Sequence, residues 1–271
     1  MLQPVTGSRW QPTLTIRASY ALHAGAAIAL VVRPGLWPWT LGAVVADHLI
    51  LTAAGLWPRS TLLGPNWTRL PEAAAATGAV AITIDDGPDP QITPQVLDLL
   101  DQHRAHATFF CIGERVERHA QLVREIVSRG HCIENHSQRH LHRFSVLGPR
   151  GMANEIERAQ QTIAAITGEL PRFFRAPAGL RNPFLEPVLA RLGLRLASWT
   201  RRGFDTVRPD ADAVFQRLSA GLRSGDILLL HDGHAARTPG GIPVILEVLP
   251  RLLRSVAQAQ LSPITLRAAL S

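Results

Sequence analysis

The sequence predicts an α/β protein with a parallel sheet, open or closed into a barrel, preceded by a hydrophobic N-terminal hairpin. Two observations predict this fold. From Ala79 onward, short and nearly continuous apolar runs alternate with amphipathic stretches, whereas residues 1–60 contain longer apolar runs. Strands buried on both faces have this continuous apolar character, which is typical of a parallel sheet covered by helices.

The apolar runs in residues 1–60 predict a two-helix membrane hairpin. Ala18–Val32 contains no charged residue, and Leu36–Leu56 follows it after the short turn Arg33-Pro34-Gly35. Five of the six tryptophans lie at or before position 67. Those flanking the second run, where an interfacial aromatic belt would lie, are Trp37, Trp39 and Trp57.

Two other interpretations of this segment stay open. The membrane hairpin has two weaknesses. The first run is shorter than the roughly 20 residues of a spanning helix. Placing Asp47-His48 at the bilayer centre would cost about 2.5–3.5 kcal/mol or more of insertion free energy. A secretory signal peptide is disfavoured because no small-x-small cleavage site follows Val32. A pair of ordinary buried helices is the third interpretation. The arginines that flank the hairpin favour a cytoplasmic position for both of its ends, but the side of the membrane on which the following domain lies stays open. These arginines are Arg9, Arg17, Arg59 and Arg69.

Beyond the hairpin, residues 61–78 contain Gly64-Pro65-Asn66 and the run PEAAAATG, which indicate a linker. Residues 79–271 follow as one domain. Its predicted strands are Ala79–Ile84, Ala107–Cys111, His131–Glu134, Arg172–Arg175, Leu194–Trp199 and Asp226–Leu230. Its predicted helices are Thr93–His103, Val116–Arg129, Gly151–Thr167, Pro187–Leu192, Asp212–Leu222 and Val244–Ala259.

Composition excludes several classes of function. The formal charge is +7, and all 28 basic residues are arginines scattered along the chain without a basic block. This pattern disfavours a nucleic-acid partner. Neither GxGxxG nor GxxxxGK[ST] is present, so no nucleotide-phosphate loop is expected. Cys111 and Cys132 have no zinc-ribbon or CxxC spacing and lie in predicted buried strands, which favours free thiols and leaves a disulfide open.

Reactive side chains stand at nearly every predicted strand end. In chain order these are Asp85-Asp86, His136 with His140, Arg175, Asp205 a few residues beyond its strand, and His231. Because the carboxyl ends of parallel strands meet at one edge of the sheet, we expect these groups to converge.

The spacing in HSQRH directs both histidine rings the same way, by one helical turn or a tight loop. An HExxH zinc-protease helix is excluded because Ser137 stands in the place of the glutamate base. Two histidines need a third ligand, which Asp86 can supply, and a His₂Asp set leaves a position open for catalysis by a divalent cation. A cation on Asp86 would also allow Asp85 beside it to stay ionised.

The four ordered motifs TIDDGP, HSQRH, RAPAG and LLLH resemble those of the polysaccharide deacetylases, the NodB-homology group also called carbohydrate esterase family four. The stretches ATFFCIG and GHCIENHS are similar to the family's second and third strand regions. The resemblance covers residues 79–266 and implies a distorted (β/α)7 barrel. It makes 79–271 the expected catalytic domain, a metal-dependent hydrolase of the N-acetyl amide in an amino-sugar glycan of the bacterial cell envelope.

The resemblance implies a metal site and a base. The implied ligands are Asp86, His136 and His140, with zinc the expected ion and cobalt, manganese or nickel as substitutes. Asp85 is the implied general base, and Arg175 would fix its orientation.

Three further roles follow from the resemblance. His231 would be the general acid for the leaving amine, and Asp205 would hold and charge it. The backbone N–H of Ala178 would stabilise the tetrahedral oxyanion. Since an ionised base and a protonated histidine are needed together, activity should fall on both sides of a pH optimum.

This sequence departs from the family pattern in the third and fourth motifs, where Ala178 replaces an aromatic residue, Arg202 an acidic residue and Thr206 a tryptophan. The substrate is therefore less defined than the reaction. An anionic substrate group could be favoured by Arg181, Arg201 and Arg202. A deacylase or deformylase of a lipid-linked sugar, or a catalytically silent carbohydrate-binding homologue, stays open. The expected location is the bacterial inner membrane, without an obligate protein partner.

Overall fold

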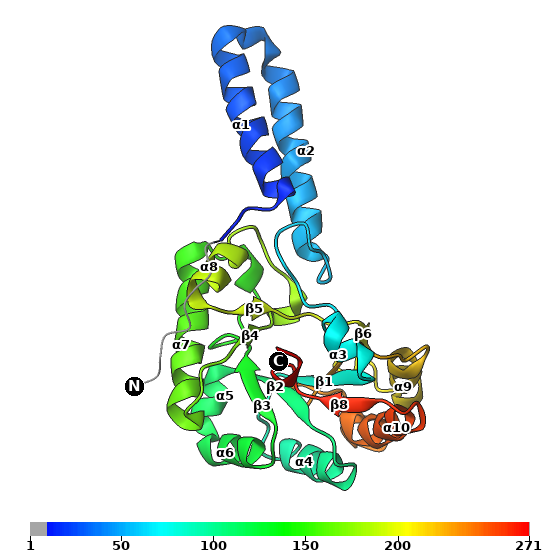
Figure 1. The fold of residues 1–271 in the computed structure, drawn as a ribbon. Helices are drawn as coiled ribbons and strands as arrows, with labels where there is room; N and C mark the ends of the chain where they lie inside the picture. The colour runs from blue at the N-terminus through cyan, green and yellow to red at the C-terminus, as the bar shows by residue number, and fades with distance from the viewer. Residues whose placement is uncertain (1–9, 271) are drawn as a thin grey trace.

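All eight strands among residues 10–270, the part of the chain that the computed structural model describes, belong to one sheet curled into an open barrel (Figure 1). Every strand pairing is parallel, the order is β5-β4-β3-β2-β1-β7-β6, and β8 pairs with β1 off this path. The strands are β1 (Ala79–Asp85), β2 (Ala107–Cys111), β3 (Cys132–Asn135), β4 (Phe173–Phe174), β5 (Arg195–Leu196), β6 (Arg201–Arg202), β7 (Ile227–His231) and β8 (Ser262–Ile264). The predicted distorted (β/α)7 architecture is confirmed.

Helices surround the curled sheet on its outer side (Figure 1). They are α4 (Thr93–Gln102), α5 (Gly113–Arg118), α6 (Ala120–Ser128), α7 (Pro149–Thr167), α8 (Leu185–Leu192), α9 (Ala211–Ser219) and α10 (Val244–Gln258). Each predicted helix is found within a few residues, but the one predicted over Val116–Arg129 is divided at His119. The division lets α5 hydrogen-bond the loop after β3, through Gly113 N to Ser137 O at 3.0 Å, while α6 packs on the sheet.

The alternation of β1 determines which side chains face the barrel interior. Ile82 and Ile84 belong to the core between the sheet and the outer helices, whereas Ala81 packs with residues of the interior. Because side chains alternate along a strand, Thr83 and Asp85 continue the interior row. Asp85 is therefore the last inward residue of β1, at the barrel mouth.

Residues 61–78, predicted as a linker, pack against the barrel instead of crossing open solvent. Trp67 N donates to Leu196 O and Ser198 N donates to Trp67 O, both at 2.9 Å. Arg69 Nη1 lies 2.6 Å from Asp226 Oδ1, beside the start of β7. The segment, which ends in the short helix α3 (Glu72–Ala76), thus lies across the gap between β5 and β7.

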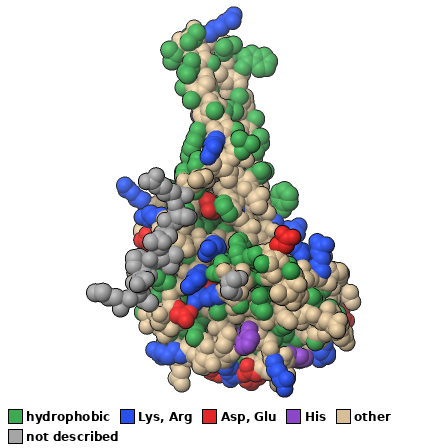
Figure 2. Space-filling model, in the orientation of Figure 1, with side chains coloured by type: hydrophobic (Ala, Val, Ile, Leu, Met, Phe, Trp, Pro, Cys, Tyr) green, Lys and Arg blue, Asp and Glu red, His purple; other side chains and the backbone are tan. Residues whose placement is uncertain are grey.

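The N-terminal segment forms a helical hairpin that projects from the barrel (Figure 1). Helix α1 (Leu14–Val32) and helix α2 (Trp37–Leu56) are joined by the 3₁₀ turn Pro34–Leu36. Both are long and apolar enough to cross a membrane, and only 11% of each candidate span is buried. Apolar side chains cover much of the hairpin surface (Figure 2). The interpretation as helices buried within this chain is therefore wrong.

Polar groups inside the hairpin pair with one another. Asp47, which is 9% exposed, accepts a hydrogen bond from Ser19 Oγ at 2.8 Å. His23 and His48 face each other beside this pair, with their Nε2 atoms 3.4 Å apart. The flanking Arg9 of the sequence prediction lies outside the described residues.

Both cysteines are free, as predicted. Cys111 ends β2 and is fully buried, while Cys132 begins β3 and is partly buried. The parallel register places Cys111 opposite Asn135 and Cys132 opposite Thr108, so the two thiols lie at different levels of the sheet.

Candidate active site and metal centre

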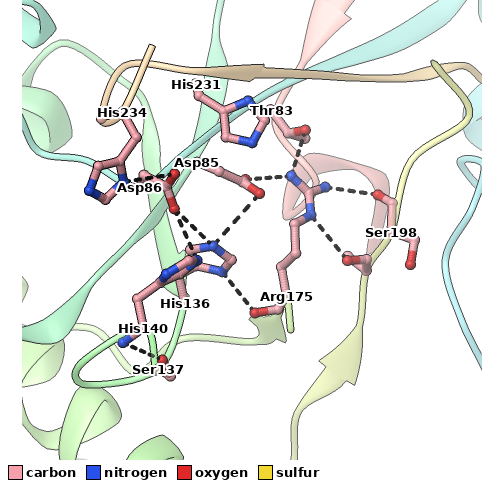
Figure 3. A network of polar contacts seen from close by, with 12 residues as sticks. Thr83, Asp85, Asp86, His136, Ser137, His140, Arg175, Ser198, His231 and His234 are labelled. Atoms are coloured by element: carbon pink, nitrogen blue, oxygen red, sulfur yellow. Dashed lines mark hydrogen bonds and ion pairs between the residues drawn. The ribbon is translucent and has the colours of Figure 1, made fainter. Parts of the chain in front are cut away.

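A cavity of about 690 Å³ opens at the carboxyl ends of the strands. Asp85, Asp86, His136, His140 and His231 line it together. They come from the ends of β1, β3 and β7, and the sticks in Figure 3 point toward one another. The predicted convergence of strand-end groups is therefore found.

The two adjacent carboxylates separate because the chain turns between them. Asp85 keeps strand pairing with β2 and β7, whereas Asp86 has a φ of 72° in the left-handed region. Asp85 consequently pairs with Arg175, and Asp86 faces the two histidines. Each carboxylate has its own counter-group, which relieves the repulsion that the sequence suggested.

The three predicted metal ligands form one cluster. Asp86 Oδ1 lies 3.3 Å from His136 Nε2 and 3.3 Å from His140 Nε2. One ligand atom from each residue can be chosen so that all lie within 4.8 Å of one another. The His136 ring is oriented by its Nδ1, 2.8 Å from the carbonyl oxygen of Arg175, which leaves Nε2 toward Asp86.

A tight loop, one of the two predicted alternatives, places the second histidine. Ser137 and His140 have positive φ values of 63° and 51°, so the HSQRH segment is not helical. Asn135 Oδ1 accepts from Ser137 N at 2.9 Å, and Ser137 Oγ accepts from His140 N at 3.0 Å. The serine that excluded the zinc-protease motif therefore shapes this loop.

The donor set fits a divalent cation. Asp86 Oδ1 is buried and has no hydrogen-bond partner among the described residues. Burial lowers the pKa of His140 to about 4, so the ring is neutral at pH 7, as a metal ligand must be. Two imidazole nitrogens and one carboxylate oxygen are a ligand set found in catalytic zinc sites.

Arg175 is buried to 1% exposure and has several partners. Its Nη1 lies 2.6 Å from Asp85 Oδ1 and 2.9 Å from Thr83 Oγ1. Its Nε donates to Ala197 O at 3.1 Å and its Nη2 to Ser198 O at 2.8 Å. This guanidinium therefore fixes one oxygen of Asp85. The other oxygen, Oδ2, faces the metal-ligand cluster and lies 3.9 Å from His136 Nε2.

The predicted pair of His231 and Asp205 also forms. His231 Nδ1 lies 2.8 Å from Asp205 Oδ1, and the His231 backbone N–H donates to Asp205 Oδ2 at 2.7 Å. Burial of the ring lowers the pKa of His231, but the charge and hydrogen bond of Asp205 outweigh burial and raise it to about 9. The imidazole is thus protonated at neutral pH and can donate a proton.

Ala178 lies in the cavity wall with Gly179 and Trp199. It has a φ of 54°, rare for a residue with a side chain, within the turn Pro177–Gly179. Gly179 follows at φ 75°, and a Cβ there would come 2.5 Å from the Trp199 ring and 2.8 Å from Pro58 Cβ.

Of the three arginines expected near the substrate, only Arg202 lines the cavity. Its guanidinium carbon lies 5.2 Å from the centre of the Trp199 ring. Arg201 instead bonds Asp226 at 2.5 Å, and Arg181 is buried against Ser60 O, so the prediction is wrong for these two. Sequence proximity to a motif could not show that their side chains turn away.

His234 is not among the site residues predicted from the sequence, yet it contacts Asp86 of the metal-ligand cluster. Its Nδ1 lies 3.2 Å from Asp86 Oδ2, and its Nε2 lies 3.0 Å from Arg115 Nη2. The one signal in the sequence was its position three residues after His231. Asp232, between them, points elsewhere and accepts a hydrogen bond from Thr93 Oγ1 at 2.5 Å.

Much of this chain is similar in sequence to known proteins. The family model described as polysaccharide deacetylase matches residues 73–197. A peptidoglycan-N-acetylglucosamine deacetylase from Bacillus cereus is 38% identical over 175 residues, which are 64% of this chain and 81% of that protein. A chitooligosaccharide deacetylase from Bradyrhizobium is 38% identical over 161 residues, 59% of this chain and 73% of that protein.

Solved structures share the fold. A family 4 carbohydrate esterase from Streptomyces lividans, in complex with acetate, is 34% identical with a TM-score of 0.62, covering 69% of this chain and 91% of that one. A family 4 pseudoenzyme from Bacillus anthracis is 22% identical with a TM-score of 0.64, covering 72% of this chain and 66% of that one. At that identity the likeness shows the fold alone.

Proposed function

This chain belongs to the polysaccharide deacetylase family, and on that premise we propose that it hydrolyses the N-acetyl amide of N-acetylglucosamine units in an oligo- or polysaccharide. The products are acetate and a free amine on the sugar. One observation carries the proposal: the cluster of Asp86, His136 and His140 shares a cavity with a carboxylate and a protonated imidazole. These are the groups that amide hydrolysis requires.

Asp86, His136 and His140 would hold the metal, most simply zinc. When bound, a divalent cation activates water at neutral pH and polarises the amide carbonyl. A divalent cation held by these three ligands would still have a coordination position for water or the substrate. His136 is kept in the binding tautomer because its Nδ1–H donates to the carbonyl of Arg175.

Asp85 is the proposed general base. Its Oδ1 is held by Arg175, so Oδ2 is the atom that takes the proton of the attacking water. Arg175 is therefore a positioning residue, because it fixes the carboxylate without reaching the reacting atoms. As water attacks the carbonyl carbon, a C–O bond forms, and the backbone N–H of Ala178, a residue that lines the cavity, is the proposed donor to the developing oxyanion.

His231 is the proposed general acid. Its Nδ1–H donates to Asp205, so Nε2–H is free to protonate the sugar nitrogen as the C–N bond breaks. Asp205 is fully buried and favours the charged ring. Protonation is needed because an amide nitrogen without a proton is a poor leaving group.

The hairpin supports a membrane location. We propose that residues 1–60 anchor the protein in the bacterial inner membrane and that 79–271 form the catalytic domain. The support is the exposure of two apolar helices and the pairing of Asp47 with Ser19. After carbonate washing of membranes the full-length protein should stay in the pellet. Release into the supernatant would contradict the anchor and favour a cleaved signal sequence.

A second candidate function, deacylation or deformylation of a lipid-linked sugar, is favoured by one feature. A groove of about 650 Å³ separates the hairpin from the barrel. Apolar and aromatic side chains, among them Tyr20, Leu56, Val146 and Phe184, line it. A hydrocarbon chain attached to a sugar could lie in this groove because it is continuous with the apolar hairpin.

The test is acid release by the full-length protein in detergent with added zinc or cobalt. N-acetylglucosamine oligomers, peptidoglycan fragments and lipid-linked acylated amino sugars are offered in parallel, and acetate and formate are both measured. Acetate from the oligomers supports the main proposal, whereas release from the lipid-linked sugars alone supports the second. Absence of release together with absence of metal binding would favour a silent homologue.

A further inference from the structure

We infer that the base of the hairpin, residues 55–60, positions the turn that carries Ala178 and so contributes to catalysis as well as to anchoring. This inference rests on the proposed function, because it concerns the proposed oxyanion donor. The hairpin base is defined as the last turn of α2 and the residues up to Ser60. It contacts two segments beside the cavity, residues 179–181 and residues 198–200.

The first contact is made with the chain directly after Ala178. Arg181 N donates to Gly55 O at 3.1 Å, and Arg181 Nη2 donates to Ser60 O. Arg181 is only 4% exposed, so these bonds are shielded from water. The turn at Pro177–Gly179 is therefore held on its C-terminal side by the hairpin base, in addition to the bonds that Asn182 makes with Ser145 O and Leu147 O of the barrel domain.

The second contact is packing against Gly179. A Cβ at Gly179 would lie 2.8 Å from Pro58 Cβ, which shows how closely the hairpin base approaches the turn. The Trp199 ring approaches the same point of Gly179, at 2.5 Å from such a Cβ, so the turn packs against Pro58 and Trp199 together.

The third contact is made with the two residues that flank Trp199. Ser198 Oγ donates to Pro58 O at 2.7 Å, and Arg59 Nη1 donates to Thr200 O at 3.3 Å. The carbonyl of Ser198 in turn accepts from Arg175, which holds the base Asp85. The hairpin base thus connects the segment beside the oxyanion donor with the segment that supports the general base.

Gly55 is the position where this docking is most sensitive. A Cβ at Gly55 would overlap the carbonyl oxygen of Arg181, and the nearest atoms are backbone, which cannot rotate away. By contrast, a Cβ at Gly42 on the same helix would meet nothing within 4 Å. Gly55→Ala should therefore displace the turn, while Gly42→Ala adds the same methyl group without a contact.

The expected effect on turnover follows from the geometry of catalysis. Loss of an oxyanion donor costs about 10²–10³ in kcat, and a displacement of about 1 Å costs about 10²-fold. We expect Gly55→Ala to lower kcat by about 10–100-fold. Zinc affinity and KM should stay close to wild type, because the metal ligands do not touch the hairpin base.

The experiment compares full-length wild type, Gly55→Ala and Gly42→Ala in detergent. Steady-state kinetics of acetate release, zinc affinity and hydrogen exchange of the amides at 176–182 are measured for each. We expect faster exchange at 176–182 and a lower kcat in Gly55→Ala alone. Equal exchange and equal kcat in the two variants would overturn the inference, and so would a Gly55→Ala variant that loses zinc and fold together.

A second variant tests the third contact, between the hairpin base and Ser198 of the barrel domain. Ser198→Ala removes only the hydroxyl that bonds Pro58 and should also speed exchange at the hairpin base. If wild type releases no acid from any substrate, the proposed function fails. The exchange comparison still decides whether the hairpin base holds the turn, because it does not depend on activity.

Discussion

The barrel mouth and the hairpin depart from ordinary protein surfaces in opposite ways. At the mouth, ionisable groups are buried: Asp85, Arg175, Asp205 and His231 are each 6% exposed or less. On the hairpin, large apolar side chains such as Val31, Trp39 and Leu49 are 65% exposed or more. Buried charge and exposed apolar surface both cost free energy in water, so each indicates an environment or a reaction that compensates for it.

The difference shows which contacts each region needs. At the mouth Asp85 pairs with Arg175 and His231 pairs with Asp205, whereas the exposed apolar faces of the hairpin have no partner among residues 10–270. We therefore expect changes at the mouth to abolish activity with little loss of fold. Changes in the hairpin outside its base, residues 55–60, should have smaller effects, on helix pairing and location.

The largest effect is expected from removal of a metal ligand. His136→Ala should lower zinc affinity by more than about 100-fold, because even partners of ligands are worth about 10–100-fold. Zinc titration of the metal-free protein measures this, with acetate release as a second readout. His106→Ala, an exposed histidine outside the cluster, is the matched control. Unchanged zinc affinity in His136→Ala would contradict the assigned centre.

The next effect concerns the base. Asp85→Asn keeps the size of the side chain but cannot take a proton, so kcat should fall by about 10²–10⁴-fold. Zinc binding should persist because Asp85 is not a ligand in the proposed arrangement. Steady-state kinetics and a zinc titration separate the two properties. Asp98→Asn at the exposed pair with Arg129 should leave both unchanged. A fully active Asp85→Asn variant would show that Asp85 is not the general base.

A pH profile tests the proposed acid. Because the pKa of His231 is raised to about 9, activity on the alkaline side should be lost as the pH rises through that region. Asp205→Asn removes the charge that raises this pKa, so the alkaline limb of kcat/KM should move to lower pH. Asp212→Asn, whose side chain is 82% exposed, is the control. An unmoved alkaline limb would mean that another group limits the rate at high pH.

The smallest effect is expected within the hairpin. Ser19→Ala removes the hydroxyl that donates to Asp47 and should weaken helix pairing by about 0.6–2 kcal/mol. Hydrogen exchange of α1 in detergent measures the change. Thr40→Ala is the control, because its hydroxyl bonds only carbonyls of its own chain segment, Leu36 O and Trp37 O. Equal protection of the two variants would show that Asp47 does not pair the helices.

The sequence predicted the site best where strand ends determine position. Asp85 and His231 end β1 and β7, and because parallel strands share one carboxyl edge they were expected to converge; the structure pairs them in register. His136 and Arg175 follow or end similar short strands. The short strands β6 and β8 carry no periodic pattern and were missed, whereas β4 and β5 lie within predicted strands.

What the sequence did not show depends on loops and on contacts between distant segments. His234 reaches Asp86 across a turn, and Arg181 turns away to Ser60, and neither direction is encoded by spacing. Residues 61–78 have the composition of a linker, yet Trp67 pairs with Ala197 far along the chain. Only tertiary packing determines such contacts.

The most direct test of the central claim is a product balance. Full-length protein freed of metal and then loaded with one equivalent of zinc is incubated with N-acetylglucosamine oligomers, and acetate and new amine are counted. We expect equal amounts of acetate and new amine, formed only with zinc and absent in the Asp85→Asn variant. Equal release by the metal-free protein, or acetate from the Asp85→Asn variant at the wild-type rate, would contradict it.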